Sequence, residues 1–286
     1  MVSSSTSSSE HRDASRITRA DGRGEDFGLL TCMTPVWGVA SRVTAFSTTR
    51  LGGISQAPYD ALNLGLHVGD DEPAVRENRR RLQESFALPE SPHWMKQTHG
   101  TDVYAIESGS IDEAICADGS WTNKPDTVLA VLTADCLPVV ICDKLGTELA
   151  VVHAGWRGLA AGILENALAR FSEQAELHAW LGPAIGPDAF EVGAEVRQAF
   201  IERNPAHETC FEAGMSAVGS GSPDKQKYWA DLYSLARAEL QQSRSVTVTG
   251  GDYCTVTQPQ WFHSHRRDGL RSGRMATVAW IGALPE

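Results

Sequence analysis

Three apolar runs of strand length follow one another in the middle of the chain, and they constrain its fold most strongly. They cover residues 127–133, 137–142 and 148–153, and a helical pattern over 159–174 follows them. Runs that are apolar at nearly every position indicate strands buried on both faces, which need a covering layer on each side. The pattern therefore predicts an α/β or α+β fold with a mixed sheet flanked by helices.

The same alternation of strand and helix patterns continues on both sides of these runs. A helix is expected to begin at Asp71, because an N-cap acid is followed by Pro73 in the first turn, and to run to about Leu88. Further strands are expected over residues 43–49, 179–181, 246–249 and 275–281, and further helices over 192–203 and 230–241.

The length of 286 residues with 42% hydrophobic content is enough for one large core. Residues 1–25 are rich in serine and predict a disordered tail. We therefore expect one layered catalytic domain over residues 26–286. Within it, residues 212–227 have loop composition and are interpreted as a surface insertion.

The charge and the absence of targeting patterns narrow the class of partner. A net charge of −11 argues against a nucleic-acid partner and favours a small-molecule substrate. No apolar run reaches membrane-spanning length, and the N-terminal residues lack the apolar core of a secretory signal, so a cytoplasmic location and no membrane partner are predicted. The six cysteines are expected to be free thiols in that compartment. The oligomeric state is left open.

Three residues that can bind a metal lie at the ends of structured runs, each beside a tight turn. They are His99 before Gly100, Cys136 before Leu137-Pro138, and His153 before Ala154-Gly155. Two imidazoles and one thiolate make a zinc site with an open position for water, which is the catalytic arrangement. Each residue also has an ordinary structural interpretation, as a turn histidine, a small core residue and a strand-end histidine bonded to backbone.

Candidate anion-binding residues are expected around this metal site. Arg157 precedes the helix expected to start near Leu159, whose free amides favour an anion. Arg50 and Asn63 come from a turn-rich segment and are predicted to bind substrate together with Arg157. For each arginine the alternative is a solvated surface charge.

Seven motifs occur in one order along residues 40–282: FSTTRLGGIS, NLGLHVGDD, KQTHG, LTADCLPV, VVHAGWRGLAAGIL, LGPAIGPDAFEVG and HSHRRDGLRSGRMA. In these motifs the chain resembles the YfiH family. That family is also called the laccase-domain or polyphenol oxidase family, and its members are described as purine nucleoside phosphorylases. His263 departs from the resemblance, because relatives usually carry an aromatic residue there.

The resemblance implies a single α/β domain distantly similar to the cytotoxic necrotizing factor hydrolases. It implies a zinc ion held by His99, Cys136 and His153, with phosphorolysis of adenosine, inosine and methylthioadenosine and deamination of adenosine. Nucleoside and phosphate are then the partners. The alternatives attached to relatives are a copper-dependent polyphenol oxidase and a hydrolase that edits peptidoglycan precursors.

The predicted residues suit these activities to different degrees. Zinc lowers the pKa of a bound water to about 7, which suits attack on C6 of adenine, whereas phosphorolysis needs Arg157 or the metal to orient phosphate. Cu²⁺ also suits a site of two histidines and one cysteine. Coupled multicopper oxidation, however, uses many His-x-His pairs, and this chain has nine histidines with a single such pair, His263-Ser-His265. A metal-stabilised binding protein is a third possibility, and Glu191 is the candidate acid for the leaving base.

Overall fold

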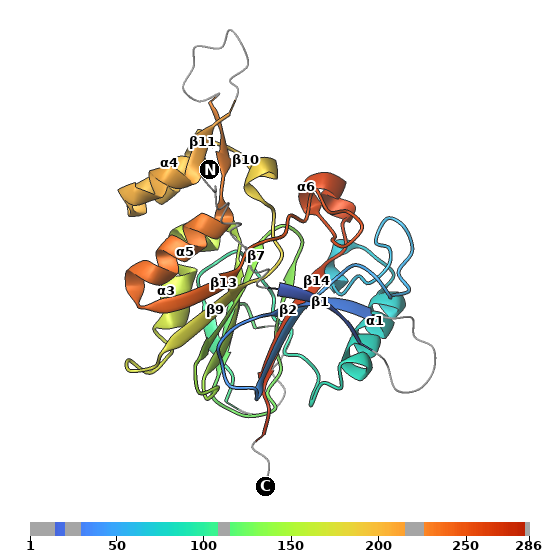
Figure 1. Ribbon diagram of the computed structural model, residues 1–286. Helices are drawn as coiled ribbons and strands as arrows, with labels where there is room; N and C mark the ends of the chain where they lie inside the picture. The colour runs from blue at the N-terminus through green and yellow to red at the C-terminus, as the bar shows by residue number, and fades with distance from the viewer. Residues whose placement is uncertain (1–14, 21–29, 108–114, 215–225, 284–286) are drawn as a thin grey trace, which may run out of the picture.

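Two β-sheets packed face to face form the centre of the molecule, with helices outside each sheet (Figure 1). The computed structural model describes residues 15–20, 30–107, 115–214 and 226–283. Helices α3 (Ile163–Leu168) and α5 (Leu232–Ser243) cover one side, and α1 (Glu72–Ser85) covers the other (Figure 1). The layers therefore run helix, sheet, sheet, helix, and the predicted mixed α/β class is confirmed.

The first sheet has six strands and contains the predicted runs 137–142 and 148–153. Its order is β13 (Val246–Gly250), β9 (Leu177–Leu181), β7 (Leu137–Asp143), β8 (Leu149–Ala154), β5 (Gly119–Thr122) and β4 (Val103–Ala105). The β13–β9 and β4–β5 pairs are parallel and the others antiparallel, so the sheet is mixed.

The second sheet has five strands in the order β1 (Ser15–Ala20), β2 (Leu30–Pro35), β3 (Val43–Thr48), β14 (Met275–Ile281) and β6 (Leu129–Thr133). Strand β1 lies inside the segment predicted to be a disordered tail. For these six residues the prediction is wrong, because their backbone pairs with the edge strand β2. The rest of that segment lies outside the described residues.

The side chains of β7 explain why its sequence is apolar at every position. Val139 and Ile141 face the helices, whereas Val140 and Cys142 lie between the two sheets. Successive residues of a strand point to opposite faces, so a strand in an inner layer must be apolar on both. All seven residues of β7 are buried.

A third, smaller sheet joins β10 (Glu191–Gly193), β12 (Lys227–Ala230) and β11 (Phe211–Ala213). It lies next to α4 (Ala194–Arg203), as Figure 1 shows. The predicted insertion 212–227 begins and ends in β11 and β12, and its residues 215–225 lie outside the described residues. These strands were not predicted, because three or four residues carry too little pattern.

The helix predicted over 159–174 is two helices, which corrects the expectation. Helix α2 (Trp156–Ala161) begins three residues earlier, and Gly162, with φ +97°, ends it and precedes α3. A left-handed residue breaks the helical path, which glycine allows without a steric penalty. Arg157 therefore lies in the first turn of a six-residue helix, which is too short for a strong dipole at its N-terminus.

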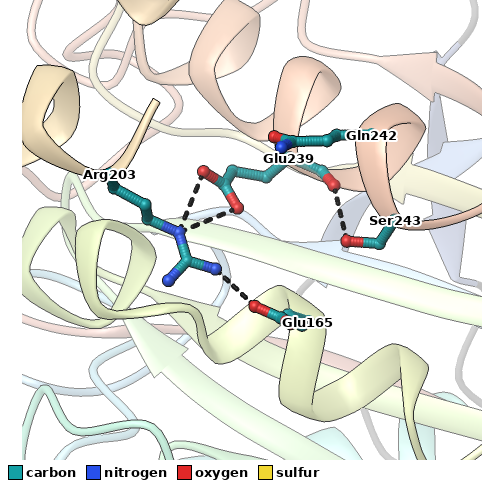
Figure 2. Close-up of a pocket in the computed structure, with 5 residues that line it drawn as sticks. All are labelled: Glu165, Arg203, Glu239, Gln242 and Ser243. Atoms are coloured by element: carbon teal, nitrogen blue, oxygen red, sulfur yellow. Dashed lines mark hydrogen bonds and ion pairs between the residues drawn. The ribbon is translucent and has the colours of Figure 1, made fainter. Parts of the chain in front are cut away.

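One arginine ties three helices together on the outer face. Arg203 of α4 lies 2.5 Å from Glu165 of α3 and 3.3 Å from Glu239 of α5 (Figure 2). The Glu239 side chain is 4% exposed, and His207 lies 3.3 Å from it. A buried carboxylate needs such partners, so this network fixes the helices over the six-stranded sheet. Among the described residues, no helix has the length and apolarity needed to cross a bilayer.

Candidate metal centre

His99, Cys136 and His153 come together at one rim of the six-stranded sheet. Their candidate ligand atoms all lie within 4.8 Å of one another, and Cys136 Sγ is 3.8 Å from His99 Nε2. Two ligands of one tetrahedral zinc ion, with Zn–S near 2.3 Å and Zn–N near 2.05 Å, are roughly 3.6 Å apart. The donor set and its spacing therefore fit zinc, and the predicted convergence of the three residues is observed.

Strand pairing explains why Cys136 and His153 meet. Leu137, at the start of β7, pairs with Ala154 at the end of β8, and Pro138 pairs with His153. The residue before β7 therefore lies beside the residues that end β8. Gly155 leaves room for the side chains of His99 and Cys136 to come close, because a Cβ at this position would lie 2.9 Å from the His99 ring and 3.2 Å from Cys136 Sγ.

Asp118 holds the two histidines of the cluster, His99 and His153, in place, and it was not predicted from the sequence. Its fully buried carboxylate lies 2.8 Å from His153 Nδ1 and accepts hydrogen bonds from the backbone N–H groups of Thr98, His99 and Gly100. The contact at Nδ1 leaves Nε2 of His153 for the metal, which is the usual role of a carboxylate behind a metal-bound histidine.

The loop that carries His99 has an unusual backbone. His99 has φ +60°, in the left-handed region that is unfavourable for residues other than glycine. The hydrogen bonds from residues 98–100 to Asp118 stabilise this conformation. Backbone strain of this kind often marks a functional site.

The electrostatics of the metal-free cluster favour a thiolate. Burial opposes ionisation of Cys136, but the charges and hydrogen bonds of His153 and His99 outweigh it and lower the pKa of the thiol to about 6. Burial also opposes protonation of His153, but Cys136 and Asp118 raise the pKa of that imidazole to about 9. Burial raises the pKa of Asp118, yet hydrogen bonds from His153, Gly100 and Thr98 hold it well below its usual range. A thiolate and a neutral histidine are the forms that bind metal.

The cluster opens into a cavity of about 760 Å³. Arg157 lines this cavity, and its guanidinium lies 4.3 Å above the centre of the Trp156 ring; its role in substrate binding stays a prediction. The lining also contains four positively charged residues outside the predicted substrate-binding set of Arg50, Asn63 and Arg157: Arg79, Lys96, Arg266 and Arg274.

The other predicted substrate-binding residues, Arg50 and Asn63, do not line this cavity. Arg50 donates to the carbonyl oxygen of Asp60 at 2.6 Å and 2.8 Å, which fixes a turn. Asn63 is fully buried, and its Oδ1 accepts from the backbone N–H of Arg274 at 2.9 Å. Asn63 therefore reaches the cavity only through Arg274.

Of Glu191, His263 and His265, only His265 lines the cavity. The Glu191 side chain is exposed and does not line the cavity, so it is poorly placed to protonate a leaving base. His265 lines the cavity, whereas His263 is fully buried away from it. All six cysteines are free, which agrees with the expectation of thiols.

Comparison with known proteins places this geometry in a family. The family model described as "Multi-copper polyphenol oxidoreductase laccase" matches residues 44–282. The chain belongs to this family. A Shigella flexneri relative named "Purine nucleoside phosphorylase YfiH" is 48% identical over 250 residues, which cover 87% of this chain and 98% of the relative. An Escherichia coli relative of the same name is 47% identical over the same shares.

A solved structure of this family has the same fold. A Neisseria meningitidis protein is 41% identical with a TM-score of 0.76, over 88% of this chain and 99% of that one. The resemblance stated from the motifs is thereby confirmed at the level of the family and the fold. The distant similarity to the cytotoxic necrotizing factor hydrolases stays a prediction.

Proposed function

We propose that this YfiH-family chain is a zinc-dependent purine nucleoside phosphorylase that acts on adenosine, inosine and methylthioadenosine and also deaminates adenosine. The observation that carries the proposal is the opening of the His99, Cys136 and His153 cluster into a cavity of about 760 Å³. Three protein ligands facing a substrate-sized cavity are the arrangement of a catalytic zinc site. Relatives 47–48% identical carry the name purine nucleoside phosphorylase. One catalytic domain over residues 26–286 and a cytoplasmic location belong to the same proposal.

The residues of the cavity have distinct roles in this reaction. Zinc held by His99, Cys136 and His153 would supply a Lewis acid and a bound water with a pKa near 7. Asp118 orients His153, and Trp156 and Phe190 offer aromatic surface for the purine. Arg157 binds substrate at the same wall as Trp156. In phosphorolysis a phosphate oxygen bonds to C1′ while the C1′–N9 bond breaks, and the purine leaves with the electron pair and takes up a proton.

A copper-dependent polyphenol oxidase is the second candidate, because the matching family model is described as a laccase. The ligand set also suits copper. Across residues 15–20, 30–107, 115–214 and 226–283, however, one cluster of three potential ligands occurs. Multicopper oxidation needs several coupled metal sites, so the nucleoside reaction agrees better with the described residues.

The test supplies zinc-loaded protein with adenosine, with and without phosphate, and resolves the products. Adenine and ribose 1-phosphate that form only with phosphate indicate phosphorolysis, and inosine that forms without phosphate indicates deamination. Cys136→Ala is expected to abolish zinc binding and both activities, whereas Cys116→Ala, at an exposed cysteine outside the cluster, is the matched control. Zinc-loaded protein that leaves nucleosides unchanged, while copper-loaded protein oxidises phenols, would overturn the proposal.

A further inference from the structure

The cavity beside the metal cluster is strongly cationic in an acidic protein. Among the described residues, its lining has five arginine or lysine side chains, Arg79, Lys96, Arg157, Arg266 and Arg274, and one carboxylate, Asp135. Both oxygens of that carboxylate are already bonded, one to the Thr255 hydroxyl and the other to a backbone N–H, each at 2.6 Å. The chain as a whole has a net charge of −11. A local excess of positive charge favours an anionic ligand.

Arg274 is the best-built member of this set. Its Nη1 donates to the backbone oxygens of Ser272 at 2.7 Å and Gly273 at 3.0 Å, which fixes the plane of the guanidinium. Within the part of the chain that the structure describes, no carboxylate forms a salt bridge with it. A partly buried guanidinium held by backbone, without an acid partner, is pre-organised for a planar or tetrahedral anion.

The loop of residues 63–65 is shaped around Arg274. Asn63 Oδ1 accepts from the Arg274 N–H, and Leu64 N–H donates to the Arg274 carbonyl at 3.0 Å. A Cβ at Gly65 would lie 2.8 Å from Arg274 Cγ, so only glycine lets the side chain lie against this loop. The buried asparagine therefore acts as a positioning residue for this arginine.

Arg79 and His67 lie at the same end of the cavity as Arg274. Arg79 donates from Nε to the Leu64 oxygen at 3.0 Å, and its guanidinium lies 4.2 Å above the centre of the Trp94 ring. Burial and the positive charges of Arg274 and Arg79 lower the pKa of His67, which places all three side chains within electrostatic reach of one another.

Arg157 and Arg266 are organised differently. Arg157 is exposed and lies over its neighbour Trp156, and the guanidinium of Arg266 lies 5.5 Å from the centre of the Phe190 ring. Nη1 of Arg266 donates to the carbonyl oxygen of Glu191 at 3.0 Å. These two arginines lie with aromatic side chains, which suits a flat purine more than a compact anion.

We infer that the phosphate of the reaction binds between Arg79 and Arg274, beside His67, and that Arg157 contacts the nucleoside instead. This inference rests on the proposed phosphorolysis. It assigns the attacking phosphate oxygen to the wall formed by α1 and the 63–65 loop. The nucleoside then lies against the wall formed by Trp156 and Phe190.

The test uses zinc-loaded protein and inorganic phosphate as the probe, with two readouts. Isothermal titration calorimetry measures phosphate binding directly, and steady-state kinetics measures the KM for phosphate at saturating adenosine. We expect Arg274→Gln and Arg79→Gln each to weaken phosphate binding and raise its KM by about 10- to 100-fold. Arg274→Lys, which keeps the charge but loses the planar fork, is expected to fall between wild type and Arg274→Gln.

Comparator variants separate this subsite from the other cationic wall. Arg157→Gln is expected to raise the KM for adenosine while the KM for phosphate changes by less than about threefold. Arg76→Gln, on the exposed side of α1 and paired with Glu72 at 2.6 Å, is the matched control and leaves both constants unchanged. If Arg274→Gln loses its fold, Arg79→Gln and Arg274→Lys carry the same test.

The outcomes distinguish this inference from the proposed function. Wild-type protein that binds phosphate but never cleaves adenosine contradicts the phosphorylase proposal, and loss of that binding in Arg79→Gln and Arg274→Gln still supports the subsite. Phosphorolysis in which Arg157→Gln alone raises the KM for phosphate overturns the subsite and leaves the function standing. Wild-type protein that shows no phosphate binding overturns the subsite as well.

Discussion

Nδ1 of His153 lies 2.8 Å from Oδ1 of Asp118, and the same oxygen accepts the backbone N–H of His99 at 2.9 Å. One carboxylate oxygen therefore orients one candidate ligand, His153, through its ring and the other, His99, through its backbone. This arrangement couples the two histidines, although 54 positions separate them in the sequence. Asp118 is consequently as important for the geometry of the site as the ligands themselves.

We expect Asp118→Asn to lower the affinity for zinc by about 10- to 100-fold, because the amide cannot satisfy His153 and three backbone donors together. Competition with a chromophoric chelator measures the affinity. Thr98→Val removes only the hydroxyl contact to Asp118, at 3.1 Å, and serves as the matched control. An affinity unchanged in Asp118→Asn would show that the carboxylate does not support the metal site.

Zinc binding should release protons in a pH-dependent number. In the metal-free protein the pKa of Cys136 is lowered to about 6 and that of His153 is raised to about 9. At pH 7 the thiol is therefore already ionised and the imidazole still protonated, so zinc displaces about one proton, from His153. Below pH 6 the thiol is protonated as well, so the number of protons released rises further.

Calorimetric titration in buffers of different ionisation enthalpy measures this number. The affinity for zinc is expected to rise with pH between pH 6 and pH 9, since the competing proton on His153 is lost across that interval. Release of about two protons at pH 7 would contradict these protonation states of the metal-free cluster.

Gly155 tests the geometry of the metal site without changing a ligand. Its φ of −63° and ψ of 153° are open to alanine, so the only conflict of Gly155→Ala is the contact of the new Cβ with His99 and Cys136. We expect the variant to fold but to bind zinc at least about tenfold more weakly, because ligands displaced by a few tenths of an ångström lose their coordination geometry. Gly100→Ala, where the nearest contact is 3.3 Å to the Thr98 hydroxyl, is the milder comparison.

The inner strands and the convergence of His99, Cys136 and His153 could be predicted because their signals are local. Residues 137–142 are apolar on both faces, and each ligand stands at the end of a structured run beside a glycine or proline. Asp118 has no such signal, because it precedes a four-residue strand and contacts residues 18 to 35 positions away. Only tertiary structure brings those positions together.

The roles of the arginines also depend on tertiary contacts that the sequence does not reveal. The sequence could not rank Arg50 against Arg274, because each lies beside a turn-rich segment and packing decides which side of the loop faces the cavity. Asn63 was predicted to bind substrate, and its loop does lie beside the cavity, but its side chain accepts a hydrogen bond from the backbone of Arg274. Gly162 was also missed as a helix end, since a single glycine inside a helical pattern is tolerated.

Arg203 provides a test of stability away from the metal site. Arg203→Gln removes the ion pairs to Glu165 and Glu239 and leaves Glu239, whose side chain is 4% exposed, without its guanidinium partner. We expect the free energy of unfolding to fall by about 3 kcal/mol. Lys144→Gln, which breaks the exposed pair with Glu176, is the matched control and is expected to cost less than about 1 kcal/mol. Urea unfolding measures both, and equal losses would mean that burial of Glu239 does not matter.

His263 should make the fold sensitive to acid. Its ring is fully buried, and neither ring nitrogen has a hydrogen-bond partner among the described residues. Burial lowers the pKa of His263 most, and the positive charges of Arg50 and Arg274 lower it further. The Leu62 backbone and Asp268 oppose this change, and the resulting pKa is about 3. The folded protein therefore keeps this histidine neutral at a pH where the unfolded chain protonates it. Its contribution to stability is complete above about pH 6.5 and is lost as the pH falls towards 3.

Replacing this histidine by the aromatic residue usual in the family removes the titrating group. Between pH 7 and pH 5, wild-type protein is expected to lose about 2 kcal/mol more stability than His263→Phe, since each unit between the two pKa values is worth about 1.4 kcal/mol. Urea unfolding at pH 7, 6 and 5 measures the difference, with His265→Gln, an exposed histidine two residues away, as the control. Parallel pH profiles for wild type and His263→Phe would mean that the buried imidazole does not set the acid limit of this fold.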